Sequence, residues 1–279
     1  MSSQPTRVRP SLPEHFCYTL FGPASAFGTD SVAIHYENAP ITEALIDIRV
    51  ELPASETGLQ VLESVHDGVK NTYPGKKKRL YLQGQLSAGD EVGASATQTV
   101  MGYSFSSEDG KQIFQARRDG FTFSRLRPYG SWPQLRDEAR RLWHIYREAV
   151  NPDKVTRVAV RYINQIDIPV STIDYKDYFR TTPEVSPELP QALSGFFMQL
   201  QFPEADFGGL LILTQTTVPP PNPATNSVIL DLDVFKQTGL VSDDDVWGVL
   251  ETLRNRKNEF FEGCITEKTR ALFGRREEY

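Results

Sequence analysis

The sequence has few cysteines and no long apolar run. Only Cys17 and Cys264 occur among the 279 residues, so a disulfide framework is not expected and a reducing compartment is. No apolar stretch approaches the roughly 20 residues of a membrane-spanning helix, so no membrane segment is expected. The first residues, Met1 to Leu12, are polar and proline-rich, unlike a secretory signal. These absences together predict a cytoplasmic protein.

The short motifs of common cofactor and metal sites are also missing. The four histidines have no histidine or cysteine partner at zinc-ligand spacing; they are His15, His35, His66 and His144. Neither a Gly-x-x-x-x-Gly-Lys-Ser/Thr phosphate loop nor a Gly-x-Gly-x-x-Gly run occurs, and no Gly-x-Ser-x-Gly nucleophile elbow is present. The sequence therefore predicts no cofactor, no metal and no catalytic residue.

What is present is the composition of a folded globular chain. Hydrophobic residues make up 39% of the sequence and charged residues 24%, which excludes a disordered chain or a coiled-coil rod. The formal net charge of −6 argues against bulk electrostatic binding of nucleic acid, although a local basic patch stays possible.

The first half of the chain switches between two hydrophobic periods. Residues Ile41 to Leu52 alternate apolar and polar side chains, which predicts a strand with one buried face. Residues 57–72 carry a helical stripe that Tyr73-Pro74-Gly75 should end. The remaining expected elements are strands at Arg79 to Leu86, Thr97 to Ser106 and Lys111 to Leu126, the last split at Asp119-Gly120, and a helix from Trp132 to Val150 with Ser131 as N-cap.

The second half predicts a similar succession of elements. A strand from Arg157 to Val170 precedes a helix that starts at Ser186-Pro187-Glu188 and carries a stripe to Leu200. Strands at Gly209 to Val218 and Ser227 to Phe235 follow, and then one long helix from Ser242 to about Phe273. Ser242 and Asp245 are spaced as a capping pair.

The order of elements predicts an α+β fold with two topologically similar strand-helix-strands-helix halves. We expect a partly flexible N-terminal arm at 1–33, a first half at 34–154 and a second half at 155–279. The sheet is expected to be mainly antiparallel, with helices covering one face. The two halves could join their strands into one sheet or pack as separate lobes, and the sequence leaves both arrangements open.

Several motifs resemble one family. They are Tyr36-Glu37-Asn38-Ala39-Pro40-Ile41-Thr42-Glu43-Ala44, Asp119 to Leu126 with Pro128-Tyr129, Trp143 with Tyr146, and Arg161-Tyr162-Ile163-Asn164. Over about Tyr36 to Phe273 the chain resembles a sporadically distributed family of uncharacterised prokaryotic proteins of this length. The resemblance implies no activity, but a patchy distribution would fit accessory genes of mobile defence or toxin–antitoxin-type operons. Tyr36, Asn38 and Glu43 are the motif residues of interest, although Asn38-Ala39-Pro40 also suits a turn into a strand.

Charge is distributed unevenly along the chain. Residues 111–147 carry nine basic and three acidic side chains, whereas residues 167–206 carry two basic and seven acidic ones. Arginines beside an aromatic ring suit phosphates, bases or an acidic partner surface. The predicted binding residues are Arg117, Arg118, Arg125, Arg127, Tyr129, Arg161 and Asn164. The alternative is that these arginines pair with acids on neighbouring strands and neutralise one another.

A second candidate site is the pair Asp231 and Asp233. Two residues apart on a strand, both carboxylates should point to one face, as in metal-dependent nucleotidyl transfer. The same alternation also describes the polar face of an ordinary amphipathic strand, and His144, beside Trp143, is expected in the core or at a rim.

The hypothesis that follows is a cytoplasmic, non-enzymatic binding protein. Its sheet surface or sheet edge would bind a protein partner or a second copy of the chain. The alternatives are a nucleotide- or phosphoester-acting enzyme, and a nucleic-acid binder that uses the arginine patch and loses affinity with salt.

Overall fold

A single antiparallel sheet joins the two predicted halves. The structure is a computed structural model that describes residues 34–53, 58–87 and 93–274, so the predicted arm at 1–33 lies outside the described residues. The sheet has nine strands in the order β2-β3-β4-β5-β1-β6-β9-β8-β7, and every neighbouring pair is antiparallel. Because β1 pairs with β6, strands of both halves belong to one sheet, and the arrangement is not two separate lobes.

The first half supplies five strands and a long helix. The elements are β1 (Ile41–Glu51), α1 (Leu59–Ser64) with a 3₁₀ turn at Val65–Gly68, β2 (Gly75–Ser87), β3 (Gly93–Ser106), β4 (Gln112–Arg117), β5 (Gly120–Leu126) and α2 (Trp132–Val150). The strand predictions and the split at Asp119-Gly120 are confirmed. The predicted helix at 57–72 is shorter than expected, since α1 gives way to the 3₁₀ turn that ends at Gly68.

The second half supplies four strands and two helices. They are β6 (Lys154–Ile168), β7 (Phe197–Glu204), β8 (Gly209–Val218), β9 (Asn226–Leu240), α3 (Asp243–Cys264) and α4 (Glu267–Phe273), with a 3₁₀ turn at Tyr175–Asp177. The strands predicted at Arg157 to Val170, Gly209 to Val218 and Ser227 to Phe235 are confirmed as β6, β8 and β9.

The predicted helix from Ser186 to Leu200 is wrong. Ser186 to Leu189 forms only a turn, closed by the Leu189 amide donating to the Ser186 carbonyl at 3.0 Å. Pro190 has no amide hydrogen and Gly195 favours an irregular backbone, so a helix cannot continue through this segment. Residues from Phe197 instead alternate with period two and form β7. The second half therefore lacks the helix that the repeat of element order required.

The predicted helix from Ser242 to Phe273 is broken into α3 and α4. Ile265 has an extended backbone and pairs with Phe179, and Thr266 then begins α4 by accepting from the Thr269 amide. The Arg180 amide donates to the Cys264 carbonyl at the end of α3, which fixes the break. Ser242 is the N-cap of α3, but its side chain makes no capping hydrogen bond, so the predicted capping pair with Asp245 is not formed.

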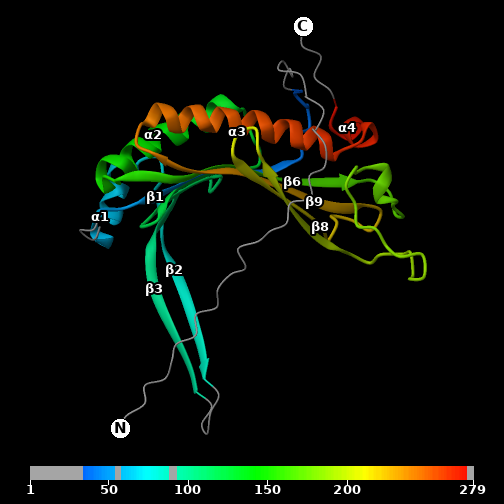
Figure 1. Ribbon diagram of the computed structural model, residues 1–279, viewed down its shortest axis with the longest axis horizontal. Helices are drawn as coiled ribbons and strands as arrows, with labels where there is room; N and C mark the ends of the chain where they lie inside the picture. Colours follow the sequence, from blue (N-terminus) through cyan, green and yellow to red (C-terminus); the bar gives the residue numbers. More distant parts are fainter. Residues whose placement is uncertain (1–33, 54–57, 88–92, 275–279) are drawn as a thin grey trace. The chain divides into compact units, whose positions relative to one another are not determined.

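Helices cover one face of the sheet (Figure 1). Helix α2 packs on β1 and β5, and α3 packs on β6 and β9. The core between them is aromatic, with Phe114, Phe121, Trp143 and Tyr146 almost fully buried. Ser131 caps α2 as predicted, accepting from the Gln134 amide at 3.5 Å. No described helix covers the opposite face of the sheet, and none of the described helices is both long and apolar enough to cross a membrane.

Candidate functional site

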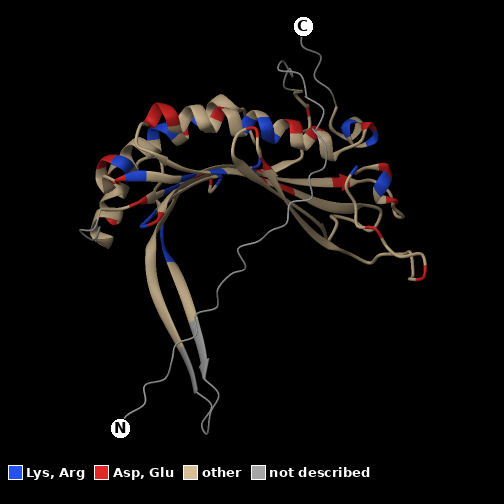
Figure 2. Cartoon of the chain, in the orientation of Figure 1, with Lys and Arg blue, Asp and Glu red and all other residues tan. Residues whose placement is uncertain are grey.

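The uncovered face of the sheet carries a ladder of alternating arginine and aspartate side chains. The pleat turns successive residues of a strand to opposite faces, so Asp47 and Arg49, which alternate with the buried Ile46 and Ile48 along β1, point away from the helices. We call this set the ion-pair ladder; its members are Arg117, Asp119, Asp47, Arg49, Arg157, Arg161, Asp231 and Asp233. It runs across β4, β5, β1, β6 and β9, where Figure 2 shows basic and acidic positions along the middle of the sheet.

Asp47 lies at the centre of the ladder. Its carboxylate accepts from Arg117 Nη2 at 2.9 Å, from Arg157 Nη1 at 3.0 Å and from Arg49 Nε at 3.0 Å. The Thr122 hydroxyl also donates to it, at 2.6 Å. Asp47 is only 7% exposed. Burial alone would raise the pKa of this carboxyl, but Arg117, Thr122 and Arg49 together lower it below its usual value, so Asp47 stays ionised.

The other end of the ladder rests on β9. Arg161 holds Asp231 with two hydrogen bonds, of which the Nε to Oδ1 distance is 2.9 Å. Arg157 reaches Asp233 at 3.0 Å and lies 4.1 Å from the centre of the Phe235 ring. Burial raises the pKa of Asp233 despite the nearby arginines, and its Oδ1 atom is buried without a described hydrogen-bond partner. Each aspartate of the ladder is nevertheless paired with at least one arginine.

Of the five predicted binding arginines, two belong to the ion-pair ladder and two others lie outside it near the strand ends. Arg117 and Arg161 belong to it, as the neutralisation alternative described. Arg118 is half-buried in the turn after β4, with its Nε buried and unpartnered among described residues. Arg127 is exposed, and its Nη2 lies 3.4 Å from the Pro40 carbonyl oxygen.

The remaining predicted residues lie on the helix-covered face. Arg125 pairs in register with the fully buried Ala44 and so shares its face. The hydroxyls of Tyr129 and Tyr162 are 2.8 Å apart under the helices. Asn164 is buried and donates to the Leu230 carbonyl at 3.0 Å. The structure therefore divides the predicted set between the two faces of the sheet, and binding by any of its members stays a prediction.

Asp231 and Asp233 point to one face, as the alternation predicted. Both are held by arginines from β6, which occupy carboxylate oxygens that a metal ion would need. Within the described ranges, no group of three or more His, Cys, Asp or Glu side chains is placed to hold a metal ion.

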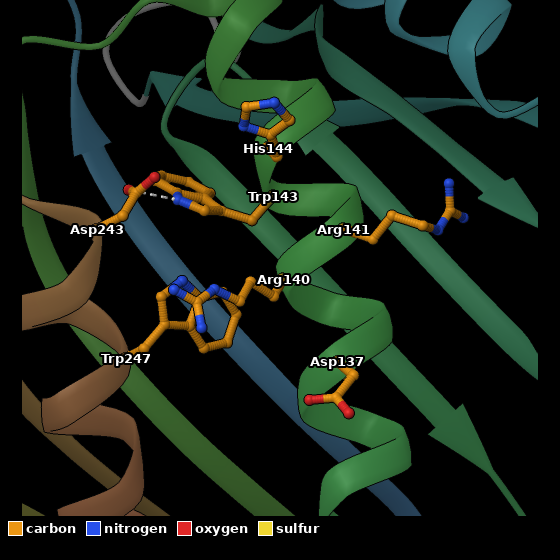
Figure 3. A pocket seen from close by; sticks show the side chains of 7 residues that line it. All are labelled: Asp137, Arg140, Arg141, Trp143, His144, Asp243 and Trp247. Atoms are coloured by element: carbon orange, nitrogen blue, oxygen red, sulfur yellow. Dashed lines mark hydrogen bonds between the residues drawn. The ribbon is translucent and has the colours of Figure 1, made fainter.

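A hollow lies between α2 and the start of α3 (Figure 3). The hollow has a volume of about 490 Å³ and is lined by Asp137, Arg140, Arg141, Trp143, His144, Asp243 and Trp247. Trp143 Nε1 donates to Asp243 at 2.9 Å, and the Arg140 guanidinium lies 5.7 Å from the Trp247 ring centre. His144 is at the rim and pairs with Glu148 at 3.2 Å. The hollow has an aromatic floor and paired charges, but no nucleophile beside a base.

One buried lysine stands apart from both regions. Lys257 of α3 is 8% exposed, and its Nζ lies 3.7 Å from the centre of the Tyr162 ring. Burial, and to a lesser extent the nearby Arg254, lower the pKa of Lys257 to about 7, although Glu262 acts in the opposite direction. No described carboxylate forms an ion pair with this amine.

The opening motif joins the start of the described chain to its end. The Tyr36 hydroxyl donates to Glu262 of α3 at 2.9 Å, and its ring meets Phe273 of α4 edge-on. The amides of Glu37 and Asn38 donate to the carbonyls of Gly274 and Phe273 at 3.1 and 2.8 Å. These contacts give the motif a structural role, which is to hold α4 against the body of the protein.

The ladder residues that sequence reasoning missed are Asp47, Arg49, Asp119 and Arg157, together with Thr122, which donates to Asp47. The alternation of β1 placed Asp47 and Arg49 on a polar face, but only the pairing register shows which strands face them. Comparison of the chain with protein-family models and with curated proteins found no match in either set.

Proposed function

We propose that this protein is a cytoplasmic, non-enzymatic binding protein whose ion-pair ladder face binds a protein partner. The observation that carries the proposal is that the ladder satisfies its own charges on a face that no described helix covers. A rigid polar surface held in place by buried hydrogen bonds needs little ordering when a partner binds.

The composition of the face favours a protein over a phosphate-bearing ligand. The ladder has four arginines and four aspartates, so it offers no excess positive charge to a polyanion. Half-buried apolar side chains flank it: Leu45 lies opposite Arg161, Ile163 opposite Asp231 and Ile212 opposite Asp233. Arginine set among apolar groups is typical of protein interfaces. The expected partner surface is apolar, with paired charges of both signs.

The cellular setting of the proposal comes from the family resemblance. A role as an accessory component of a mobile defence or toxin–antitoxin-type operon would fit a protein that acts by binding a partner. The strand order supports the hypothesis of topological repeats, because β1 and β6 are central and each is flanked outward by the other strands of its half, whereas the helix missing between β6 and β7 opposes it.

Affinity capture with surface variants tests the proposal. Tagged protein is purified from its host, and co-purifying proteins, nucleic acid and small molecules are identified in parallel. We expect a stoichiometric protein partner. Its recovered amount should fall at least about tenfold with Ile212→Arg, because a charge at this position disrupts the apolar flank of the ladder. The matched control is Glu148→Arg on the outer side of α2, which should retain the partner.

Two results would contradict this function. If Ile212→Arg keeps its fold by circular dichroism and still retains the partner, the ladder face is not the binding surface. If nucleic acid co-purifies instead and is lost with Arg118→Ala/Arg127→Ala, the arginine-patch alternative is the better account.

A further inference from the structure

The β2 end of the sheet is basic and apolar. Strands β2 and β3 run beyond the rest of the sheet (Figure 1) and carry four basic residues, Lys76 to Arg79, and no acidic one. Lys76 pairs with Glu63, whereas Lys77, Lys78 and Arg79 are exposed and have no ion pair with a described residue. Directly after them Leu80, Tyr81 and Leu82 are exposed, Leu82 by 70%. No described strand pairs with the outer edge of β2.

The opposite end of the sheet is acidic and apolar. β7 is the other edge strand, and Phe197 at its start is 70% exposed. Leu189 and Leu193, in the segment just before β7, are also exposed, as is Phe202 within it. The chain from 167 to 206, which ends at this edge, carries seven acidic residues and two basic ones, and Glu184 and Glu188 are exposed beside the leucines.

The exposed apolar side chains gather at these two ends. Among the described residues nine large apolar side chains are exposed, and seven of them lie on β2 or on and just before β7. An uncovered edge strand with adjacent apolar side chains is a site where another chain adds. The two ends of one molecule therefore offer the same kind of apolar surface with opposite charge.

We infer that this protein associates head to tail with further copies of itself, the β2–β3 end of one copy docking on the β7 end of the next. Opposite charge brings the two ends together, and the apolar side chains of each end lose their water at the contact. A contact between two different surfaces of one chain leaves one free end of each kind. Such a contact extends to a ring or an open filament and does not stop at a symmetric dimer.

A second copy of the chain accounts for the charge and the exposed apolar side chains of both ends, whereas nucleic acid as the binding partner does not. Nucleic acid would suit the lysines but not Leu80 and Leu82, and it would be repelled by the acidic β7 end. Lysines on an edge strand can also serve only to prevent unwanted pairing, but residues 80–82 carry no charge and stay exposed. The inference goes beyond the proposed function because it concerns the ends of the sheet and not the ion-pair ladder.

Sedimentation velocity of the full chain tests the inference. For the wild type we expect a mass above the 31.5 kDa of one chain, rising with protein concentration and falling at high salt. Tyr81→Thr/Leu82→Thr removes the apolar part of the β2 end, and Leu193→Thr/Phe197→Thr removes that of the β7 end. Each double variant alone should sediment as a single chain, and circular dichroism checks its fold.

Mixing the two double variants gives the decisive result. Each keeps one intact end, so an equimolar mixture should form a complex of twice the single-chain mass and nothing larger. Val241→Thr, at an exposed apolar position away from both ends, should associate like the wild type. A wild type that stays at 31.5 kDa at all concentrations overturns the inference. So does a double variant that self-associates like the wild type, or a mixture that gives no complex. Ile212→Arg is judged by the loss of a different protein and not of a second copy, so its outcome stays distinct although Ile212 pairs with Gln201 of β7.

Discussion

Asp47 is the residue on which the ion-pair ladder depends. Three arginines from β1, β4 and β6 and one threonine from β5 donate to its carboxylate, so a single acid joins four strands. Charges removed from water in this way stabilise a fold only while every partner is present, because an unpaired buried charge costs several times more than an exposed one. The ladder is therefore sensitive to substitution at Asp47 and tolerant at the half-exposed Asp119.

Asp47→Asn should lower the free energy of unfolding by roughly 3–5 kcal/mol, since Arg117 and Arg157 would lose their shared anion inside the sheet face. The matched control is Asp119→Asn, whose half-exposed carboxylate should contribute no more than about 1 kcal/mol. Urea unfolding measures both. Because the folded pKa of Asp47 is lowered, its stabilisation is present above the usual value of 3.8 and is lost as the pH falls below it. Equal costs for the two variants would contradict a ladder centred on Asp47.

Lys257 should make stability rise with pH above neutrality. Its folded pKa of about 7 lies below the usual 10.5, so between these values the unfolded chain binds a proton that the folded chain does not. The wild type should gain about 2 kcal/mol from this group between roughly pH 7 and 9. Lys257→Met lacks the titration and should be the more stable protein at pH 7. Urea unfolding at the two pH values measures the difference, and parallel pH profiles for the two proteins would show that Lys257 is charged in the folded state.

Among the elements, the β4–β5 hairpin fixes the position of the ladder. Its turn carries Asp119 and places Arg117 beside Asp47 of the neighbouring strand. Gly120 has a φ of +148° and lies so close to β1 that a Cβ atom would overlap the Ile48 carbonyl oxygen. Only glycine allows both the backbone conformation and the close approach.

Gly120→Ala should therefore destabilise the protein by more than about 3 kcal/mol, because the backbone of β1 must move to accept the methyl group. Gly110→Ala is the matched control: Gly110 also has a positive φ, of +68°, but has open space around it, so its cost should stay within about 1–2 kcal/mol. Thermal unfolding followed by circular dichroism compares the two variants. A similar loss in both would mean that conformation alone, and not the contact with β1, requires glycine at position 120.

Element type could be predicted wherever one hydrophobic period runs without interruption. β1, β6, β8 and α2 follow their patterns to within a few residues. The failures lie where tertiary contacts or proline decide. Ile265 leaves the helix to pair with Phe179, and Pro190 prevents the helix predicted before β7. The candidate site was harder to predict from the sequence, because the arginines that follow one another along the chain lie on two different faces of the sheet. Asp47 is a partner of Arg117 only because strand register brings β1 beside the β4–β5 hairpin.

On the scale of the whole molecule, the two faces and the two ends of the sheet differ in composition. The helix-covered face holds the aromatic core, with Trp143 and Tyr146 against Phe121. The uncovered face carries the ion-pair ladder and its apolar flank, to which the proposed function assigns a protein partner. The ends carry most of the exposed apolar side chains of the described residues, to which the inferred self-association assigns a second copy. Ile212 and Thr214 pair with residues of β7, so the identity of the bound protein, a different protein or a second copy, separates the two roles.

The central claim is that a partner protein binds the ion-pair ladder face. Site-specific photo-cross-linking in the host tests it most directly, with a benzophenone side chain at Thr214, which lies opposite Asp231, and at Glu148 on the outer side of α2 as the control. The account predicts a cross-link from position 214 to one defined protein and none from position 148. Cross-links from position 148 alone, or from neither position while a partner still co-purifies, would contradict it.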